Sequence, residues 1–315
     1  YYDELKESLP EVDAFVRIQD YPHLSELLDP LLDHSSKVVY GKHERLVSTL
    51  KHSAYLKIAE GCSNRCSYCA IPLIRGSMDS YPIDSLVQQA QKLADDGVKE
   101  IVLIAQDTSR FGEEKGSNQL VDLLEKINEI EGIEWIRLLY LYPNAMTDSL
   151  LKGMKRLSKV LPYFDIPIQH ADNTLLKNMF RKGTAEDNAD AIKRIRDLFD
   201  EPILRTTVIV GFPGESEEQF QTLLRFIEDN EFDRLGAFTY SPEDDTVAFD
   251  LEDDVPQALK EDRLHRLMQV QAAISDKRML KQVGKVYRTL LESRVSKQNI
   301  YYGRTYTMAP DDVDG

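Results

Sequence analysis

The sequence predicts an α/β protein in which a parallel sheet curls into a partial, TIM-like barrel of six β/α units. From about residue 55, short apolar runs alternate with amphipathic helical stretches, which is typical of repeated β-α units. Hydrophobic residues make up 42% of the 315 residues, enough for one large core. Right-handed crossovers would bring the C-terminal ends of the strands to one rim, where active sites of such barrels lie.

Six apolar runs are expected to form the strands. They are Tyr55–Glu60, Glu100–Ala105, Trp135–Tyr140, Phe164–Ile168, Ile203–Val210 and Arg234–Tyr240. The stretches between them place apolar residues at i, i+3, i+4 and i+7, which indicates helices. The clearest are Ile83–Asp95, Gln119–Ile130, Asp187–Phe199 and Glu217–Asp229, the last with Ser216 as its expected N-cap.

The flanking segments have other patterns. Residues 256–282 are expected to form one long helix that closes the barrel, so the barrel domain spans 54–282. Residues 283–315 contain two expected strands, Val286–Glu292 and Asn299–Tyr306, which are too few for a stable module. Residues 1–32 are expected to hold a strand-like run near Asp13–Phe15 and a helix over Tyr21–Leu32, and the polar residues 33–53 form a linker. The chain begins at Tyr1, so we expect both ends to be truncated.

Three cysteines, Cys62, Cys66 and Cys69, lie within eight residues and are the only cysteines in the chain. Thiols spaced this closely cannot pair as unstrained disulfides, so the loop is suited to a metal centre. A zinc site would need a fourth ligand such as His52 or His170, neither of which has the spacing of zinc motifs. Iron–sulfur clusters are held by such runs, and three ligands to a four-iron cluster leave one iron open.

The Cys-x-x-x-Cys-x-x-Cys spacing, with the aromatic Tyr68 before the last cysteine, resembles the signature of the radical S-adenosylmethionine (SAM) enzymes. The resemblance implies a radical SAM barrel and a [4Fe-4S] cluster on the three cysteines, with SAM bound to the open iron. It also implies one-electron cleavage of SAM to a 5′-deoxyadenosyl radical. An iron–sulfur electron carrier is the alternative from another class, but a carrier needs a fully ligated cluster.

Further candidates for cofactor contact follow the other strands. They are Gln106 and Asp107, Gln169 and His170, Arg205, Val210 and Gly211, and Tyr240. Arg205 could pair with the SAM carboxylate, and the glycine turn after Val210 would let the backbone approach a flat ligand. Each has an ordinary alternative: a turn or helix cap at Asp107, a structural histidine, a surface ion pair at Arg205, or core packing at Tyr240.

Several motifs are similar to the methylthiotransferase branch of these enzymes, namely residues 56–62, Ile74-Arg75-Gly76 and Ile209 to Glu215. Residues 106–109, 165–171 and 303–315 resemble the RimO subfamily, which modifies an aspartate β-carbon of small-subunit ribosomal protein S-twelve. The other subfamily, of the MiaB type, modifies an adenosine of transfer RNA. The resemblance identifies residues 283–315 as the first part of a TRAM domain and residues 1–32 as the tail of an N-terminal domain that carries a second cluster.

The charge of the chain agrees with a basic protein partner. Its 54 acidic and 39 basic residues give a net charge of −15, which opposes binding to a phosphate backbone, so nucleic acid is not the expected substrate. The chain shows no apolar run long enough for a membrane span and no leader, so we expect a cytoplasmic location. The family resemblance further implies a reductant of the flavodoxin type.

Overall fold

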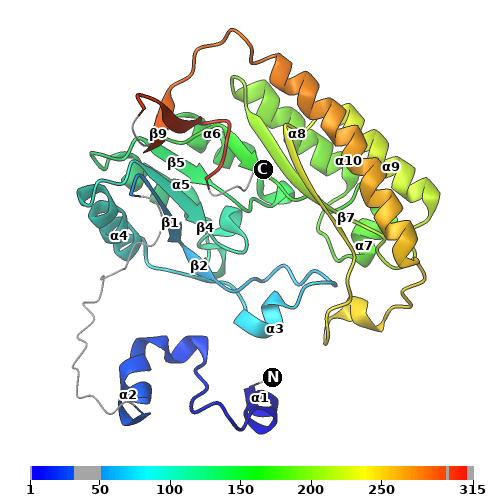
Figure 1. The fold of residues 1–315 in the computed structure, drawn as a ribbon, viewed down its shortest axis with the longest axis horizontal. Coiled ribbons are helices and arrows are strands. Elements are labelled where there is room, and N and C mark those ends of the chain that lie inside the picture. The colour runs from blue at the N-terminus through cyan, green and yellow to red at the C-terminus, as the bar shows by residue number, and fades with distance from the viewer. Residues whose placement is uncertain (1, 32–50, 296–297, 311–315) are drawn as a thin grey trace. The chain divides into compact units, whose positions relative to one another are not determined.

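The computed structural model describes residues 2–31, 51–295 and 298–310 (Figure 1). The chain divides into two compact units, Tyr1–Leu46 and Val47–Gly315. The first unit contains α1 (Tyr2–Ser8) and α2 (Leu24–Leu28), and α2 lies between the 3-10 helices Ile18–His23 and Asp29–Leu31.

Two expectations for the first unit need correction. The helix expected over Tyr21–Leu32 is a short α-helical turn within 3-10 structure. The strand-like run near Asp13–Phe15 is wrong, because these residues adopt no strand. Phe15 instead packs edge-on against Tyr2, and its carbonyl accepts a hydrogen bond from the Tyr2 hydroxyl at 3.2 Å. The linker expected at residues 33–53 lies outside the described residues, apart from its last three.

Six parallel strands form the centre of the second unit within the described residues. They are β1 (Ser53–Lys57), β4 (Glu100–Ile104), β5 (Trp135–Leu138), β6 (Tyr163–Asp165), β7 (Ile203–Val210) and β8 (Arg234–Thr239). They pair as two parallel sheets, β1-β4-β5 and β6-β7-β8. Backbone hydrogen bonds from Leu161 to Ile136 and from Leu141 to Asp165 join the sheets, at 2.9 and 2.8 Å. The α/β prediction is confirmed. In the described part of the chain, no strand pairing joins β8 to β1.

The first predicted strand is interrupted at Ile58. Residues Ala59–Glu60 form a separate strand, β2, which pairs antiparallel with β3 (Asp79–Ser80). The cysteine loop leaves directly from β2. The β2-β3 pairing therefore closes the base of the segment that contains the cysteine loop.

Helices pack on the outside of the sheets, as Figure 1 shows for α8, α9 and α10 beside β7. The helices are α3 (Ile71–Arg75), α4 (Ile83–Asp95), α5 (Leu120–Asn128), α6 (Asp148–Lys155), α7 (Asn173–Asn178), α8 (Ala185–Leu198), α9 (Glu217–Asn230) and α10 (Gln257–Leu280). Ser216 caps α9 as predicted, because its hydroxyl accepts from the Gln219 N–H. The sequence did not predict α3, α6 and α7, which are too short for a periodic pattern.

Along the described part of the chain, no helix has both the length and the apolar character needed to cross a membrane.

A hairpin of β9 (Thr289–Arg294) and β10 (Tyr301–Thr305) follows α10, as the two predicted strands require. Its Arg304 forms a buried ion pair with Glu100 at the start of β4. The other oxygen of Glu100 accepts from Arg137 Nε of β5 at 2.8 Å. Arg304 also pairs with Glu292 of β9 at 2.6 Å. A single buried carboxylate therefore joins the hairpin to two strands of the sheet.

We predict that Glu100→Gln lowers the free energy of unfolding by about 3 kcal/mol or more, because the change leaves two buried arginines without their common counter-ion. Urea denaturation at pH 7 measures the effect. The control is Lys126→Met, which removes an exposed pair with Asp84 and should cost less than about 1 kcal/mol. Equal losses in the two variants would contradict the assigned importance of Glu100.

Candidate functional site

The three cysteines line one cavity of about 670 Å³. The cavity lies at the C-terminal side of the sheet, and each of the six parallel strands, or the residues directly after it, contributes to its wall. The lining residues include Lys57, Gln106, Tyr140, Gln169, Thr207 and Phe238. The cysteine loop and the strand ends therefore meet as the β/α pattern predicts.

The cysteine loop is held by backbone contacts at both ends. Gly61 has φ +68°, and a Cβ there would overlap the carbonyl groups of Gly76 and Ser77. The Cys62 N–H donates to Gly76 O at 3.1 Å. At the other end, the Ser67 N–H donates to Met179 O at 3.1 Å, and Ser67 O accepts from the Ala248 N–H at 2.8 Å. These bonds fix the loop to the residues after α7 and to the segment after β8.

The thiols are suited to a group larger than one ion. No three His, Cys, Asp or Glu side chains of the described residues converge as the ligands of a single metal ion would. Burial raises the pKa of both Cys62 and Cys69, and the backbone N–H groups of Asn64 and Ile71 partly offset this rise. Soft sulfur ligands spread around one cavity fit an iron–sulfur cluster, which is wider than one ion.

Five of the other predicted residues line the same cavity: Tyr68, Gln106, Asp107, Gln169 and Arg205. Asp107 supports the cysteine loop, because its carboxylate accepts from Asn64 Nδ2 at 2.7 Å and from Ser109 Oγ at 2.5 Å. Burial raises the pKa of Asp107, and these two hydrogen bonds act in the opposite direction. Arg205 donates to Asp165 Oδ1 at 2.7 Å, so an ion pair forms part of the cavity wall.

Two glutamines bring acceptor atoms to the cavity. Gln106 Oε1 and Gln169 Oε1 are buried and have no hydrogen-bond partner within the structure's described ranges. Gln169 has φ +69° and Tyr140, also in the wall, has φ +60°. Such strain is found mostly at functional sites. The strained backbone and the open acceptors both indicate a ligand-binding wall.

Four predicted residues, His170, Val210, Gly211 and Tyr240, do not line the cavity. His170 is fully buried; its Nδ1 accepts from the Asp172 N–H at 3.0 Å and its Nε2 lies 3.1 Å from Glu215 Oε1. Because Nδ1 accepts, Nε2 carries the proton and donates to Glu215. Tyr240 is buried against Phe212, and its hydroxyl donates to Ala248 O at 2.9 Å.

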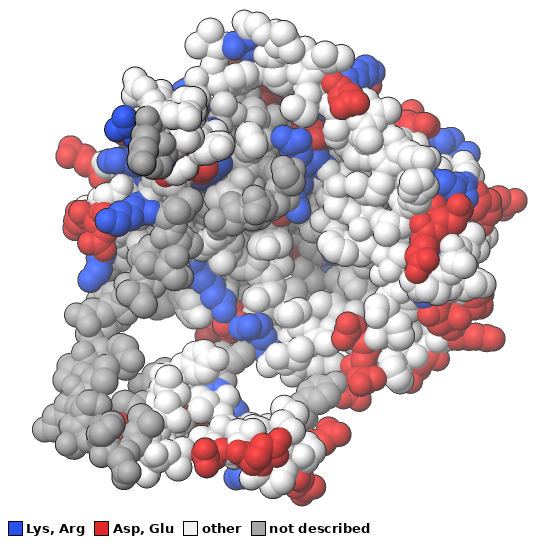
Figure 2. Space-filling model, viewed as in Figure 1, with Lys and Arg blue, Asp and Glu red and all other residues white. Residues whose placement is uncertain are grey.

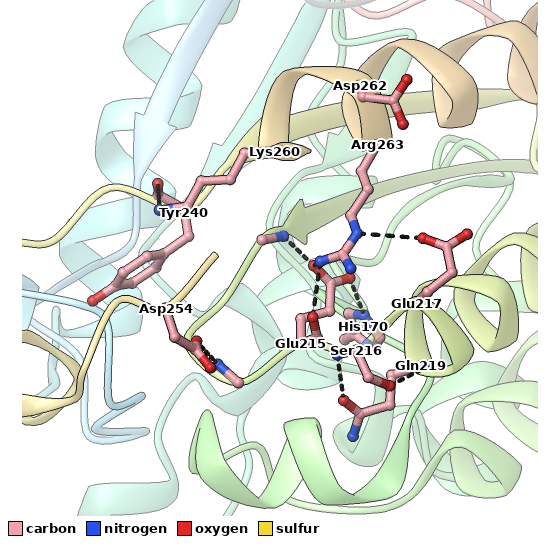
Figure 3. A network of polar contacts seen from close by, with 12 residues as sticks. His170, Glu215, Ser216, Glu217, Gln219, Tyr240, Asp254, Lys260, Asp262 and Arg263 are labelled. Carbon is pink, nitrogen blue, oxygen red and sulfur yellow. Dashed lines mark hydrogen bonds and ion pairs between the residues drawn. The ribbon is translucent and has the colours of Figure 1, made fainter. Parts of the chain in front are cut away.

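His170 and Tyr240 belong to the polar contacts drawn in Figure 3. Arg263 of α10 donates to the carbonyl and to Oε2 of Glu215, at 2.9 and 3.0 Å. The Gly211 N–H also donates to Oε2 of Glu215. Gly211 has φ +72°, and a Cβ there would overlap the Lys260 side chain of α10. The network thus pins α10 to the turn after β7.

The structure adds three residues that the sequence did not single out, Asn64, Tyr142 and Arg181, all of which line the cavity. Arg181 lies 3.6 Å from the sulfur of Cys66 although 115 positions separate them. Its guanidinium also stacks 3.9 Å from the centre of the Tyr142 ring. Asn64 lies within the cysteine loop and Tyr142 follows the third predicted strand, so both had a local signal, whereas Arg181 reaches the site only through the turn after α7.

An acidic segment runs beside the cysteine loop. Residues 241–256, between β8 and α10, contain seven acidic residues and no basic ones. The Ala248 N–H donates to the Ser67 carbonyl. Burial raises the pKa of Cys69, and the charge of the Glu243 carboxylate raises it slightly further. Figure 2 shows acidic side chains on the side of the molecule where Figure 1 places α9 and this segment.

Comparison with known proteins agrees with this geometry. Residues 56–227 match the radical SAM superfamily. A solved structure of TsrM, a radical SAM methyltransferase from Kitasatospora setae, has a TM-score of 0.50 at 14% identity and covers 62% of this chain and 39% of its own. That similarity concerns the fold alone.

Curated relatives resemble the whole chain. Ribosomal protein uS12 methylthiotransferase RimO from Alkaliphilus oremlandii is 43% identical over 100% of this chain and 72% of its own length. RimO from Caldicellulosiruptor saccharolyticus is 46% identical over 100% and 73%. The resemblance predicted from the sequence is thereby confirmed. The chain belongs to the radical SAM superfamily and, within it, to the RimO family of methylthiotransferases.

Proposed function

We propose that this chain is the catalytic part of a radical SAM enzyme that transfers a methylthio group to an aspartate β-carbon of ribosomal protein uS12. The observation that carries the proposal is the meeting of all three cysteines with polar groups from the strand ends in one cavity. RimO relatives that match the whole chain give the reaction class and the substrate. The acidic surface beside that cavity is consistent with a basic protein as the substrate.

The six strands, in this proposal, are an open (β/α)6 barrel that spans residues 54–282. The hairpin β9-β10 is the first part of a TRAM domain at residues 283–315, and residues 1–32 are the tail of an N-terminal domain. The parallel order of the strands and the antiparallel hairpin support this division.

Cys62, Cys66 and Cys69 would hold a [4Fe-4S] cluster with one iron open to SAM. When bound, this cluster supplies the electron for reductive cleavage of SAM. The chain contributes position and exclusion of water. Loop contacts through Cys62 and Ser67 hold the thiols in place, and the N–H groups of Asn64 and Ile71 offset part of the rise that burial causes in the pKa of Cys62 and Cys69.

The remaining wall would bind SAM. The open acceptors Gln106 Oε1 and Gln169 Oε1 can receive N–H groups of the cofactor. Arg205 provides a positive group at the wall beside Asp165, and Tyr68 provides an aromatic surface. His170, Gly211 and Tyr240 would act indirectly, through the network of Figure 3 that joins the turn after β7 to α10, and Val210 would act through the buried core.

Sulfur transfer requires a further cofactor. The sequence resemblance implies a second cluster that carries the sulfur, and residues 1–315 contain no cysteine beyond the three in the loop. The ligands of a second cluster would therefore lie outside these residues. A flavodoxin-type reductant is the expected electron source for the first cluster.

Substrate recognition is assigned to the acidic segment. Seven acidic residues at 241–256, next to the cysteine loop, form a surface complementary to a basic protein. They would repel the phosphates of transfer RNA. The negative charge beside the cysteine loop therefore favours a protein substrate over RNA.

We predict that replacing any one of the three cysteines by serine abolishes iron binding and SAM cleavage. The loss should exceed about 100-fold, since even partners outside the ligand shell are worth 10–100-fold in metal affinity. Iron content and 5′-deoxyadenosine production after anaerobic reconstitution measure it. Ser63→Ala is the control, because Ser63 lies in the same loop and only accepts from the Met78 N–H. Cysteine variants that keep full iron would refute the cluster assignment.

We also predict that the double change Glu243→Gln and Asp245→Asn weakens recognition of uS12. The KM for the protein substrate should rise about 5-fold, which corresponds to a loss of about 1 kcal/mol in binding free energy. The increase should be smaller at high salt, because salt screens the charges. SAM cleavage without substrate, measured in the same variant, separates an effect on uS12 binding from an effect of the lost Glu243 charge on Cys69. The matched control is Glu228→Gln with Asp229→Asn in the last turn of α9, which removes the same charge at a distance from the cysteine loop. An identical KM for both double variants would contradict the assignment.

A further inference from the structure

Arg181 provides a cation directly beside one of the three cysteines. Its Nη1 lies 3.6 Å from Cys66 Sγ, within hydrogen-bonding range of sulfur. Its Nη2 donates to Pro167 O at 2.6 Å. The two ends of the guanidinium thus connect the cysteine loop to the residues after β6. The planar guanidinium of Arg181 therefore bridges Cys66 and Pro167 in the cavity wall.

The position of this guanidinium is fixed from several sides. The ring of Tyr142 lies 3.9 Å from the guanidinium carbon, in a stacked cation–π contact. The Tyr142 hydroxyl accepts from the Lys182 N–H at 3.2 Å, and the Arg181 N–H donates to Leu176 O at 2.8 Å. Phe180, just before Arg181, has φ +55°, a strained conformation that the turn after α7 imposes.

Arg181 has no directly paired carboxylate among the described residues, although the buried Asp107 carboxylate lies near enough for the Arg181 charge to oppose the rise that burial causes in the pKa of Asp107. Within the described ranges, no Asp or Glu forms an ion pair with it, in contrast to Arg110, which pairs with Asp107 and Glu113 around the same tyrosine. Arginine stays protonated at any relevant pH. In a partly buried wall, where the dielectric constant is low, its field acts on the neighbouring sulfur with little screening.

We propose that Arg181 is a positioning residue that raises the reduction potential of the cluster held by Cys62, Cys66 and Cys69. This inference rests on the cluster assignment in the proposed function. On reduction the cluster takes one electron from an external reductant, so its charge becomes one unit more negative, and no bond forms or breaks. A fixed cation that donates to Cys66 Sγ stabilises the more negative state. Arg181 would thereby ease the first electron transfer without contacting the substrate.

The test is a potentiometric titration of the reconstituted chain, with dithionite as the reductant and the electron paramagnetic resonance signal of the reduced cluster as the readout. Arg181→Gln removes the charge and keeps a polar side chain. We expect the equilibrium to shift towards the oxidised form by about tenfold or more, which is about 59 mV for a one-electron couple. Arg181→Lys keeps the charge but loses the planar fork and the stacking, so its potential should fall by less.

The matched control is Lys182→Gln, which removes a charge from the adjacent, exposed side chain and should leave the potential unchanged. A wild-type potential in an Arg181→Gln variant with full iron content would overturn the inference and leave Arg181 as a structural brace. If that variant retains no iron, Arg181→Met, which also removes the charge but keeps an apolar side chain against the Tyr142 ring, replaces it: a lowered potential supports the inference and a wild-type potential overturns it. A wild-type chain that binds no cluster would instead refute the proposed function. Iron analysis of the wild-type chain distinguishes this outcome from a failure of the inference about Arg181.

Discussion

The peptide groups of Ser67 hold together the three segments on which the site depends. The N–H of Ser67 donates to Met179 O, and its carbonyl accepts from Ala248, so residues 67, 179 and 248 are joined at one point. The first lies between two cysteines, the second precedes Arg181, and the third lies in the acidic segment. Rotation of the loop at Ser67 would separate both groups from these partners, and buried backbone groups left without partners are costly. The cavity geometry follows from this constraint.

Two buried glutamates extend the same principle to the rest of the second unit. Glu215, in the turn after β7, pairs with Arg263 of α10 and with His170 after β6, and Glu100 joins the β9-β10 hairpin to β4 and β5 through Arg304 and Arg137. Burying such charges is costly, so they contribute less to net stability than to one specific arrangement. In this chain they fix two C-terminal segments onto the sheets: α10 at the turn after β7 and the β9-β10 hairpin at the start of β4.

Local patterns predicted the elements that depend on local physics. β7 and α4 begin and end where alternation and helical periodicity predict, and the cysteine spacing marked the metal loop. The sequence also placed Gln169 and His170 together after a strand. It could not tell that Gln169 faces the cavity and His170 faces Glu215, because that depends on the positive φ of Gln169. Arg181 was missed for a related reason, since only the turn after α7 brings it to Cys66.

The acidic segment beside the cysteine loop directs the methylthio transfer to a basic protein and not to RNA, as proposed above. An anaerobic competition tests this assignment most directly: the full-length enzyme, reduced and supplied with SAM, is offered uS12 and transfer RNA together, and each is analysed by mass spectrometry. The account predicts a methylthio group on an aspartate of uS12 and unmodified RNA. Modification of the RNA alone would contradict the assigned substrate while leaving the cluster chemistry intact.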